Sequence, residues 1–135
     1  MAMMKAELFW LTLTTVLTGL LWVPYILDRM AVRGLMVTLD NPSPRHKPQT
    51  GWAVRLMNAH INQVENLVIF GILVLVLDAL AISTPLTVLA CAVFFWSRLT
   101  YVVIYAIGVR VLRTLAFTVG FLAEVALVLA IFRII

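Results

Sequence analysis

The chain has 135 residues, of which 64% are hydrophobic and only 12% are charged, and its mean hydropathy is +1.09. About a quarter of the residues of a soluble domain are charged, so this composition indicates a chain that folds in lipid. The net charge is +4, which is compatible with nucleic-acid binding. The charges are too few and too scattered for that function, however, and no basic stripe alternates with aromatic residues. The single cysteine, Cys91, excludes an intramolecular disulfide bond.

Four apolar stretches follow one another along the chain, at residues 6–27, 55–82, 86–108 and 111–134. Each has the roughly 20 residues needed to cross the hydrocarbon core of a bilayer. Backbone polar groups in lipid must be hydrogen-bonded within their own segment, which predicts helices. The sequence therefore predicts an all-α integral membrane four-helix bundle, formed by a single domain over residues 1–135.

The longest connection between these stretches covers residues 28–54. It contains NPSP at residues 41–44 and KP at residues 47–48, and both break regular structure. Its first part, residues 28–39, can continue the first helix beyond the membrane surface.

Positive charges gather on one side of the predicted membrane domain. That side carries seven of them: Arg29, Arg33, Arg45, Lys47, Arg55, Arg110 and Arg113. The opposite side carries two, Lys5 and Arg133. Because Lys and Arg are enriched in cytosolic loops, we expect both basic connections in the cytosol and both termini on the other side.

Five polar residues of the second stretch fall on one helical stripe about 100° wide. They are Arg55, Asn58, Asn62, Glu65 and Asn66. Glu65 would lie about 15 Å below Arg55, close to the middle of the bilayer. Surface polarity does not reach this depth, so the stripe is expected to face protein.

The third stretch places Arg98, Tyr101 and Tyr105 on one face, with Arg98 about 15 Å inside the membrane. A charge at this depth is usually paired inside the bundle. We therefore expect Arg98 to pair mainly with Glu65, with Glu124 of the fourth stretch as a second partner. Such a pair can also serve only to fix the register of the helices, and the two tyrosines can be packing aromatics.

The remaining polar residues of the stretches carry weaker signals. His60 falls on another face and is expected to be a hydrogen-bonded histidine of the bundle, while Asp78 is expected at the membrane interface. No His, Cys or carboxylate spacing resembles a metal site. No glycine-rich phosphate loop is present either.

These patterns resemble the MAPEG family, the membrane-associated proteins of eicosanoid and glutathione metabolism. The second stretch carries the family pattern as Arg55, Ala59, Asn62 and Glu65, followed by Phe70. The third stretch carries it as Arg98, Tyr101 and Tyr105, and the fourth opens with Arg113 in VLRTLAF. The resemblance covers about residues 5–133 and is to a bacterial-type member.

The resemblance implies a left-handed bundle assembled as a homotrimer in the bacterial inner membrane, with glutathione bound as co-substrate between neighbouring subunits. The residues that would line this pocket are Arg55, Asn62, Glu65, Arg98, Tyr101 and Tyr105. Arg113 would stabilise the glutathione thiolate, Tyr105 is the second catalytic candidate, and Arg110 is a rival to Arg113. Arginines suit the carboxylates of glutathione, and a positive group near sulfur favours the thiolate.

The implied function is a glutathione-dependent transferase or peroxidase that acts on lipophilic electrophiles or lipid hydroperoxides. The alternative is a non-catalytic protein of the same fold that binds a membrane lipid or another amphiphile, because the cationic groups also suit phospholipid head groups. Asn58 stands where eicosanoid-making members often have a second arginine, which removes one carboxylate contact. A small multidrug exporter also has four helices, but its first helix would need a carboxylate, and none lies between Leu8 and Leu27.

Overall fold

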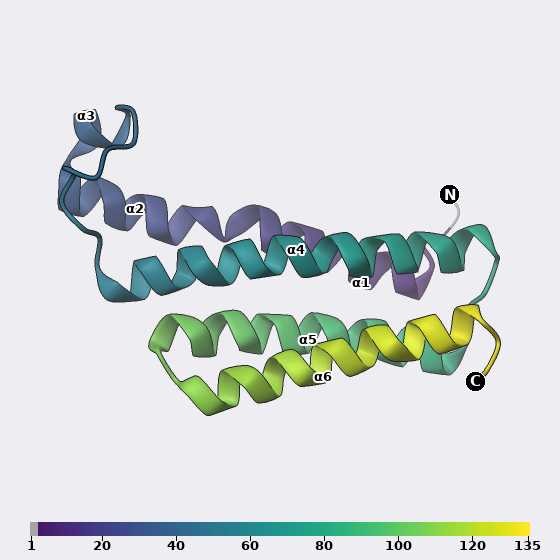
Figure 1. Ribbon diagram of the computed structural model, residues 1–135. Helices are drawn as coiled ribbons and strands as arrows, with labels where there is room; N and C mark the ends of the chain where they lie inside the picture. Colours follow the sequence, from purple (N-terminus) through teal and green to yellow (C-terminus); the bar gives the residue numbers. More distant parts are fainter. Residues whose placement is uncertain (1–2) are drawn as a thin grey trace.

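The computed structural model describes residues 3–135, and every regular element within them is a helix (Figure 1). The helices are α1 (Ala6–Leu20), α2 (Trp22–Arg33), α3 (Leu35–Thr38), α4 (Gly51–Ala79), α5 (Pro85–Ile107) and α6 (Arg110–Ile131). Four stretches are long and apolar enough to cross a membrane: α1 with α2 as Ala6–Arg33, then α4, α5 and α6. The predicted four-helix membrane bundle is confirmed.

The helices are arranged as two antiparallel pairs. The continuous stretch of α1 and α2 runs beside α4, α5 runs beside α6, and α5 also contacts α1 and α4 (Figure 1). The start of α1 and the end of α6 lie at one end of the bundle, and the long α2–α4 connection and the short α5–α6 connection lie at the other (Figure 1). The basic residues of the long connection and of the helix ends that adjoin both connections therefore share one end.

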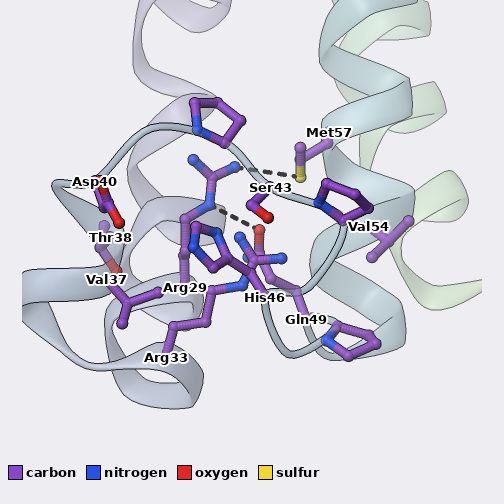
Figure 2. A pocket seen from close by; sticks show the side chains of 13 residues that line it. Arg29, Arg33, Val37, Thr38, Asp40, Ser43, His46, Gln49, Val54 and Met57 are labelled. Carbon is purple, nitrogen blue, oxygen red and sulfur yellow. Dashed lines mark hydrogen bonds between the residues drawn. The ribbon is translucent and has the colours of Figure 1, made fainter.

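The first helix continues past the predicted end at residue 27, as far as Arg33, and α3 follows after a left-handed glycine, Gly34 (φ 81°). The rest of the connection folds back against α2 (Figure 2). Arg29 Nε donates to Gln49 Oε1 at 2.9 Å, and Arg33 Nε donates to the Lys47 carbonyl at 2.6 Å. Two arginines of α2 thus hold the proline-rich segment in place.

Helix α4 begins at Gly51, four residues before the predicted start at Arg55. Its N-cap, Thr50, is bound by the carboxylate of Asp28, which accepts hydrogen bonds from Thr50 Oγ1 at 2.5 Å and Thr50 N at 3.2 Å. Acidic groups stabilise the free N–H groups and the dipole at a helix N-terminus. Thr50 is a residue type that is common at the N-cap, but the carboxylate that binds it belongs to α2 and is distant in sequence.

Helices α4 and α6 end at Ala79 and Ile131, three residues before their predicted ends at 82 and 134. Each is followed by a non-glycine residue in the left-handed region, Ala81 (φ 55°) and Arg133 (φ 57°), and by backbone hydrogen bonds that close the helix. Glycine is the usual signal for this ending. It is present after α2, as Gly34, and after α5, where Gly108 (φ 89°) terminates the helix close to the predicted residue.

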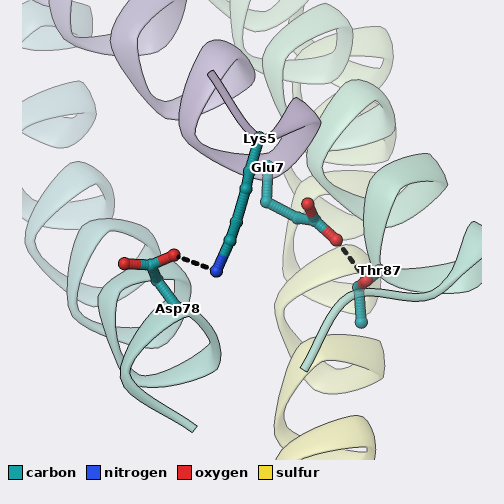
Figure 3. A network of polar contacts seen from close by, with 4 residues as sticks. All are labelled: Lys5, Glu7, Asp78 and Thr87. Atoms are coloured by element: carbon teal, nitrogen blue, oxygen red, sulfur yellow. Dashed lines mark hydrogen bonds and ion pairs between the residues drawn. The ribbon is translucent and has the colours of Figure 1, made fainter. Parts of the chain in front are cut away.

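The end of the bundle that carries the chain termini is joined by two polar contacts (Figure 3). Lys5 Nζ forms an ion pair with Asp78 Oδ1 at 2.7 Å, and both side chains are exposed to a large extent. Thr87 Oγ1 donates to Glu7 Oε1 at 2.6 Å, and both of these residues are buried. These contacts join α4 and α5 to the start of the first helix.

Apolar side chains form two cores along the bundle. The larger core lies toward the chain termini and includes Phe70 and Phe94, whose rings stack with their centres 4.0 Å apart. The smaller core lies toward the α5–α6 connection and includes Ala59 and Tyr101. Between Phe94 and Tyr101 on α5 comes Arg98, so a polar layer separates the two cores.

Candidate functional site

Arg98 of α5 is the centre of a buried hydrogen-bond network between three helices. Its side chain is 1% exposed. Arg98 Nε donates to Gln63 Oε1 and Arg98 Nη2 donates to Asn62 Oδ1, each at 2.6 Å. Gln63 Nε2 in turn donates to Thr18 Oγ1 of α1 at 3.0 Å. We call Arg98, Asn62, Gln63 and Thr18 the Arg98 network.

The prediction that Glu65 is the main partner of Arg98 is wrong within the chain. The face of α4 that is buried against α1 and α5 contains Ala53, Ala59 and Gln63, whereas Glu65 is exposed. At 100° per residue, Gln63 and Glu65 point about 160° apart on the helix. Only part of the predicted stripe faces α5: Arg55 and Asn62 contact that helix, whereas Asn58 and Glu65 are exposed. The small residues of the buried face were the signal that could have shown this.

Glu124 of α6 is the second acidic residue that was predicted beside Arg98. It is 6% exposed, and it forms no ion pair with Arg98 shorter than 4 Å. Within residues 3–135, its Oε1 atom has no hydrogen-bond partner. Glu124 therefore lies buried in the bundle without an ion pair to Arg98.

Aromatic rings extend from Arg98 toward the α5–α6 connection. The Arg98 guanidinium carbon lies 4.2 Å from the centre of the Tyr101 ring, and Tyr101 meets Tyr105 edge to face with ring centres 5.7 Å apart. The guanidinium carbon of Arg113 lies 4.3 Å from the centre of the Tyr105 ring. Four of the predicted site residues thus form one column, which we call the arginine–tyrosine column: Arg98, Tyr101, Tyr105 and Arg113.

Arg55 of α4 reaches the outer end of this column from the opposite side. Its Nε donates to the carbonyl of Ala106 at 2.9 Å, in the last turn of α5. This carbonyl has no partner within its own helix, and a cation is favourable at a helix C-terminus. Gly108 beside it has φ 89°, a left-handed conformation that residues with a Cβ atom rarely adopt, and it closes the end of α5 next to Arg55. Arg55 is therefore anchored to α5.

The two arginines at the start of α6 differ in their surroundings. Arg113 is half-buried against Tyr105, whereas Arg110 is exposed. Among the residues described, Arg110 also makes no side-chain hydrogen bond. The arrangement thus brings Arg113, and not Arg110, into contact with the other predicted site residues.

One face of α4 carries polar groups that nothing in residues 3–135 covers. Asn58 and Glu65 are exposed, and the exposed apolar side chains of Ile61, Val68 and Ile72 surround them. Glu65 lies about 21 Å from the start of α4, near the middle of this helix. A carboxylate in contact with lipid at such a depth is strongly unfavourable. This face therefore has the character of a surface that protein covers.

His60 lies outside the column and is hydrogen-bonded, as predicted: its Nδ1 atom lies 2.8 Å from the hydroxyl oxygen of Tyr25. In the part of the chain that the structure describes, no group of three His, Cys, Asp or Glu residues is placed to hold a metal ion.

Sequence reasoning did not find Gln63 or Thr18. Gln63 lies among the polar residues of the second stretch, but it was not selected because it falls outside the predicted helical stripe.

Comparison with protein families gives one match: the sequence model of the MAPEG family covers residues 8–133, nearly the whole chain. No curated protein and no solved structure matches the chain.

Proposed function

Because the chain belongs to the MAPEG family, we propose that it is a membrane-embedded glutathione-dependent enzyme, a transferase or peroxidase for lipophilic electrophiles or lipid hydroperoxides. The observation that carries the proposal is the arginine–tyrosine column, which ends at the half-buried Arg113. A cation that is partly shielded from water and held against an aromatic ring is well suited to stabilise a thiolate.

Three residues of the chain are suited to particular groups of glutathione. The peptide has two carboxylates, one ammonium group and one thiol, so it needs cationic donors, one acidic group and a positive charge beside sulfur. Arg113 would serve the thiolate, with Tyr105 holding its guanidinium in place. Glu65, on the uncovered face of α4, would contact the ammonium group, and Asn62, beside Arg98, would contact the polar backbone of the peptide.

Arg98 has a different role in this proposal from the one the resemblance implied. Its side chain is 1% exposed, and two of its three guanidinium nitrogens already donate to Gln63 and Asn62, so little of Arg98 is accessible to a ligand. Arg98 is therefore a positioning residue, which orients Asn62 from one side and the Tyr101 ring from the other. Arg55 likewise positions the end of α5 through its bond to Ala106.

The proposed transferase step begins with the glutathione thiolate, which Arg113 stabilises. Its sulfur attacks an electrophilic carbon, a carbon–sulfur bond forms, and the leaving group departs with the bonding electron pair. In the peroxidase reaction, two glutathione molecules are oxidised to the disulfide while the hydroperoxide is reduced to an alcohol and water. Either second substrate would reach sulfur from the lipid.

A homotrimer is part of the proposal. The support for it is the exposed face of α4, where Asn58 and Glu65 lie among apolar side chains near the middle of a membrane span. A neighbouring copy would cover this face and complete the glutathione site. The mass of the protein in mild detergent, measured by native mass spectrometry, is expected to be three times that of the chain.

The decisive experiment measures glutathione binding to the detergent-purified protein together with the ultraviolet absorbance of the thiolate. We expect saturable binding, a thiolate signal that Arg113→Leu abolishes, and the same signal in Arg110→Leu as in the unchanged protein. Arg133→Leu, at the other end of the bundle, is the matched control. Absence of binding at millimolar glutathione would contradict the proposal and favour the alternative, a non-catalytic lipid- or amphiphile-binding protein.

A further inference from the structure

A cavity of about 580 Å³ lies between the end of α2, helix α3, the proline-rich segment and the start of α4 (Figure 2). Its polar lining consists of two arginines and one histidine, one carboxylate, two hydroxyls and one amide: Arg29, Arg33, His46, Asp40, Thr38, Ser43 and Gln49. The apolar lining includes Val37, Val54 and Met57. It shares no residue with the arginine–tyrosine column.

The two arginines of this cavity are held in place but not neutralised. Each is anchored through Nε, Arg29 by Gln49 and Arg33 by the Lys47 carbonyl, and Arg29 Nη2 makes a weak contact with Met57 Sδ at 3.8 Å. Within residues 3–135, neither guanidinium forms an ion pair, and the two terminal nitrogens of Arg33 donate no hydrogen bond. Oriented guanidinium donors without a counter-ion are suited to bind a carboxylate or phosphate.

The surroundings of the cavity indicate its level in the membrane. Helix α3 and the adjoining turn expose the apolar side chains of Leu35, Met36 and Leu39, which are 55%, 78% and 71% exposed, and Met30 of α2 is exposed beside them. Such a short apolar segment next to basic residues is expected to rest at the boundary between head groups and acyl chains. The spanning stretch also ends at Arg33. The cavity therefore lies at the level of the lipid phosphates.

We propose that this cavity binds the phosphate of an anionic membrane phospholipid. Arg29, Arg33 and His46 would contact the phosphate oxygens, while Val54 and Met57 would contact the glycerol and the first carbons of an acyl chain. Two arginines and the single carboxylate of Asp40 leave a formal charge of +1 with neutral histidine, which matches a phosphodiester with one negative charge. The apolar lining favours a lipid over free phosphate, which would leave those side chains without a partner.

The test is the thermal unfolding of the detergent-purified protein with added phosphatidylglycerol, phosphatidylcholine or inorganic phosphate, together with native mass spectrometry of the bound lipid. We expect phosphatidylglycerol alone to raise Tm and to remain bound. Arg33→Gln is expected to weaken this binding at least tenfold. Arg45→Gln, an exposed arginine of the same connection that does not line the cavity, is the matched control.

A second variant, His46→Glu, keeps the test valid if Arg33→Gln does not fold, because it adds a negative charge to a half-exposed position of the cavity wall. It is expected to abolish phosphatidylglycerol binding. Equal stabilisation by phosphatidylcholine, equal stabilisation by inorganic phosphate, or equal losses in the cavity variants and in Arg45→Gln would each overturn the proposal. The measurement contains no glutathione, so its outcome is independent of the proposed enzyme.

Discussion

The guanidinium carbon of Arg113 lies 4.3 Å from the centre of the Tyr105 ring, which joins the first turn of α6 to the last turn of α5. The chain reverses direction between these residues, at the left-handed Gly108. The contact therefore fixes the position of Arg113 relative to α5. A reactive sulfur beside Arg113 would meet a cation whose position is set by an aromatic ring and not by a flexible loop.

Replacement of Tyr105 tests this contact. A partly desolvated cation–π contact contributes roughly 1 kcal/mol, so Tyr105→Leu is expected to lower the unfolding free energy by about that amount. Tyr105→Phe keeps the ring and should unfold close to the unchanged protein. Thermal unfolding in detergent measures the difference between the two variants. The same pair is measured in a protein that also carries Arg113→Leu, which lacks the cation. If Phe and Leu are equally destabilising, the hydroxyl group and not the ring is what matters.

The Arg98 network predicts a strong coupling between two buried side chains. Arg98→Leu leaves the amide of Gln63 without its donor, and Gln63→Leu leaves a buried guanidinium with one partner fewer. Removal of one partner from a buried charged contact typically costs about 3 kcal/mol. Each single variant is therefore expected to lose stability on that scale.

The double variant Arg98→Leu with Gln63→Leu gives the sharper result, because it removes both partners together. Its loss is expected to fall well short of the sum of the two single losses, which measures the interaction directly. Strict additivity in the same unfolding assay would show that the hydrogen bond contributes nothing. Arg45→Leu, at an exposed position of the connection, is the control for loss of charge alone.

The sequence predicted the class of this fold well and its internal contacts less well. Composition and stretch length identified four membrane-crossing helices, because lipid imposes a strict requirement on both. The ends of α4 and α6 were misjudged, since Ala81 and Arg133 adopt a conformation that glycine normally signals. The start of α4 depends on Asp28, which is distant in sequence and invisible to local reasoning.

In the candidate site too, sequence periodicity predicted which residues share a helix face but not which faces pack together. Helical spacing on one element correctly grouped Arg98, Tyr101 and Tyr105, because residues three and four positions apart share a face. Periodicity alone does not show which face of α4 meets α5. Helical periodicity therefore predicted Glu65 as the partner of Arg98, whereas in the structure Arg98 donates a hydrogen bond to Gln63.

The two polar contacts near the ends of the chain are expected to contribute different amounts to the free energy of unfolding. Asp78→Asn removes an exposed ion pair, which typically contributes about 0.5 kcal/mol and weakens with salt. Thr87→Val removes the donor to buried Glu7 Oε1, while Glu7 Oε2 already lacks a partner within residues 3–135. Leaving such a buried group unpaired costs about 2 kcal/mol. Unfolding at low and high salt compares the two, and an equal loss in both variants would contradict this ranking.

The close approach of α5 and α6 depends on Gly120. A Cβ atom at this position would lie 2.9 Å from Ser97 Oγ and 3.5 Å from Arg98 Cδ, so Gly120→Ala forces either the hydroxyl or the whole of α6 to move. Overpacking of this kind costs about 1 kcal/mol or more. Gly19→Ala is the matched control, because a Cβ atom there meets nothing within 4 Å. It should leave the protein at least as stable as before.

Rescue by a second change identifies the cause of that loss. Ser97 Oγ donates to the Phe94 carbonyl of its own helix, so Ser97→Ala removes the clashing atom with little loss of stability. Gly120→Ala combined with Ser97→Ala is therefore expected to recover most of the stability that Gly120→Ala loses in thermal unfolding. If the double variant is no more stable than Gly120→Ala, the strain lies in the helix backbones or in the displaced Arg98, and the Ser97 contact does not limit the packing.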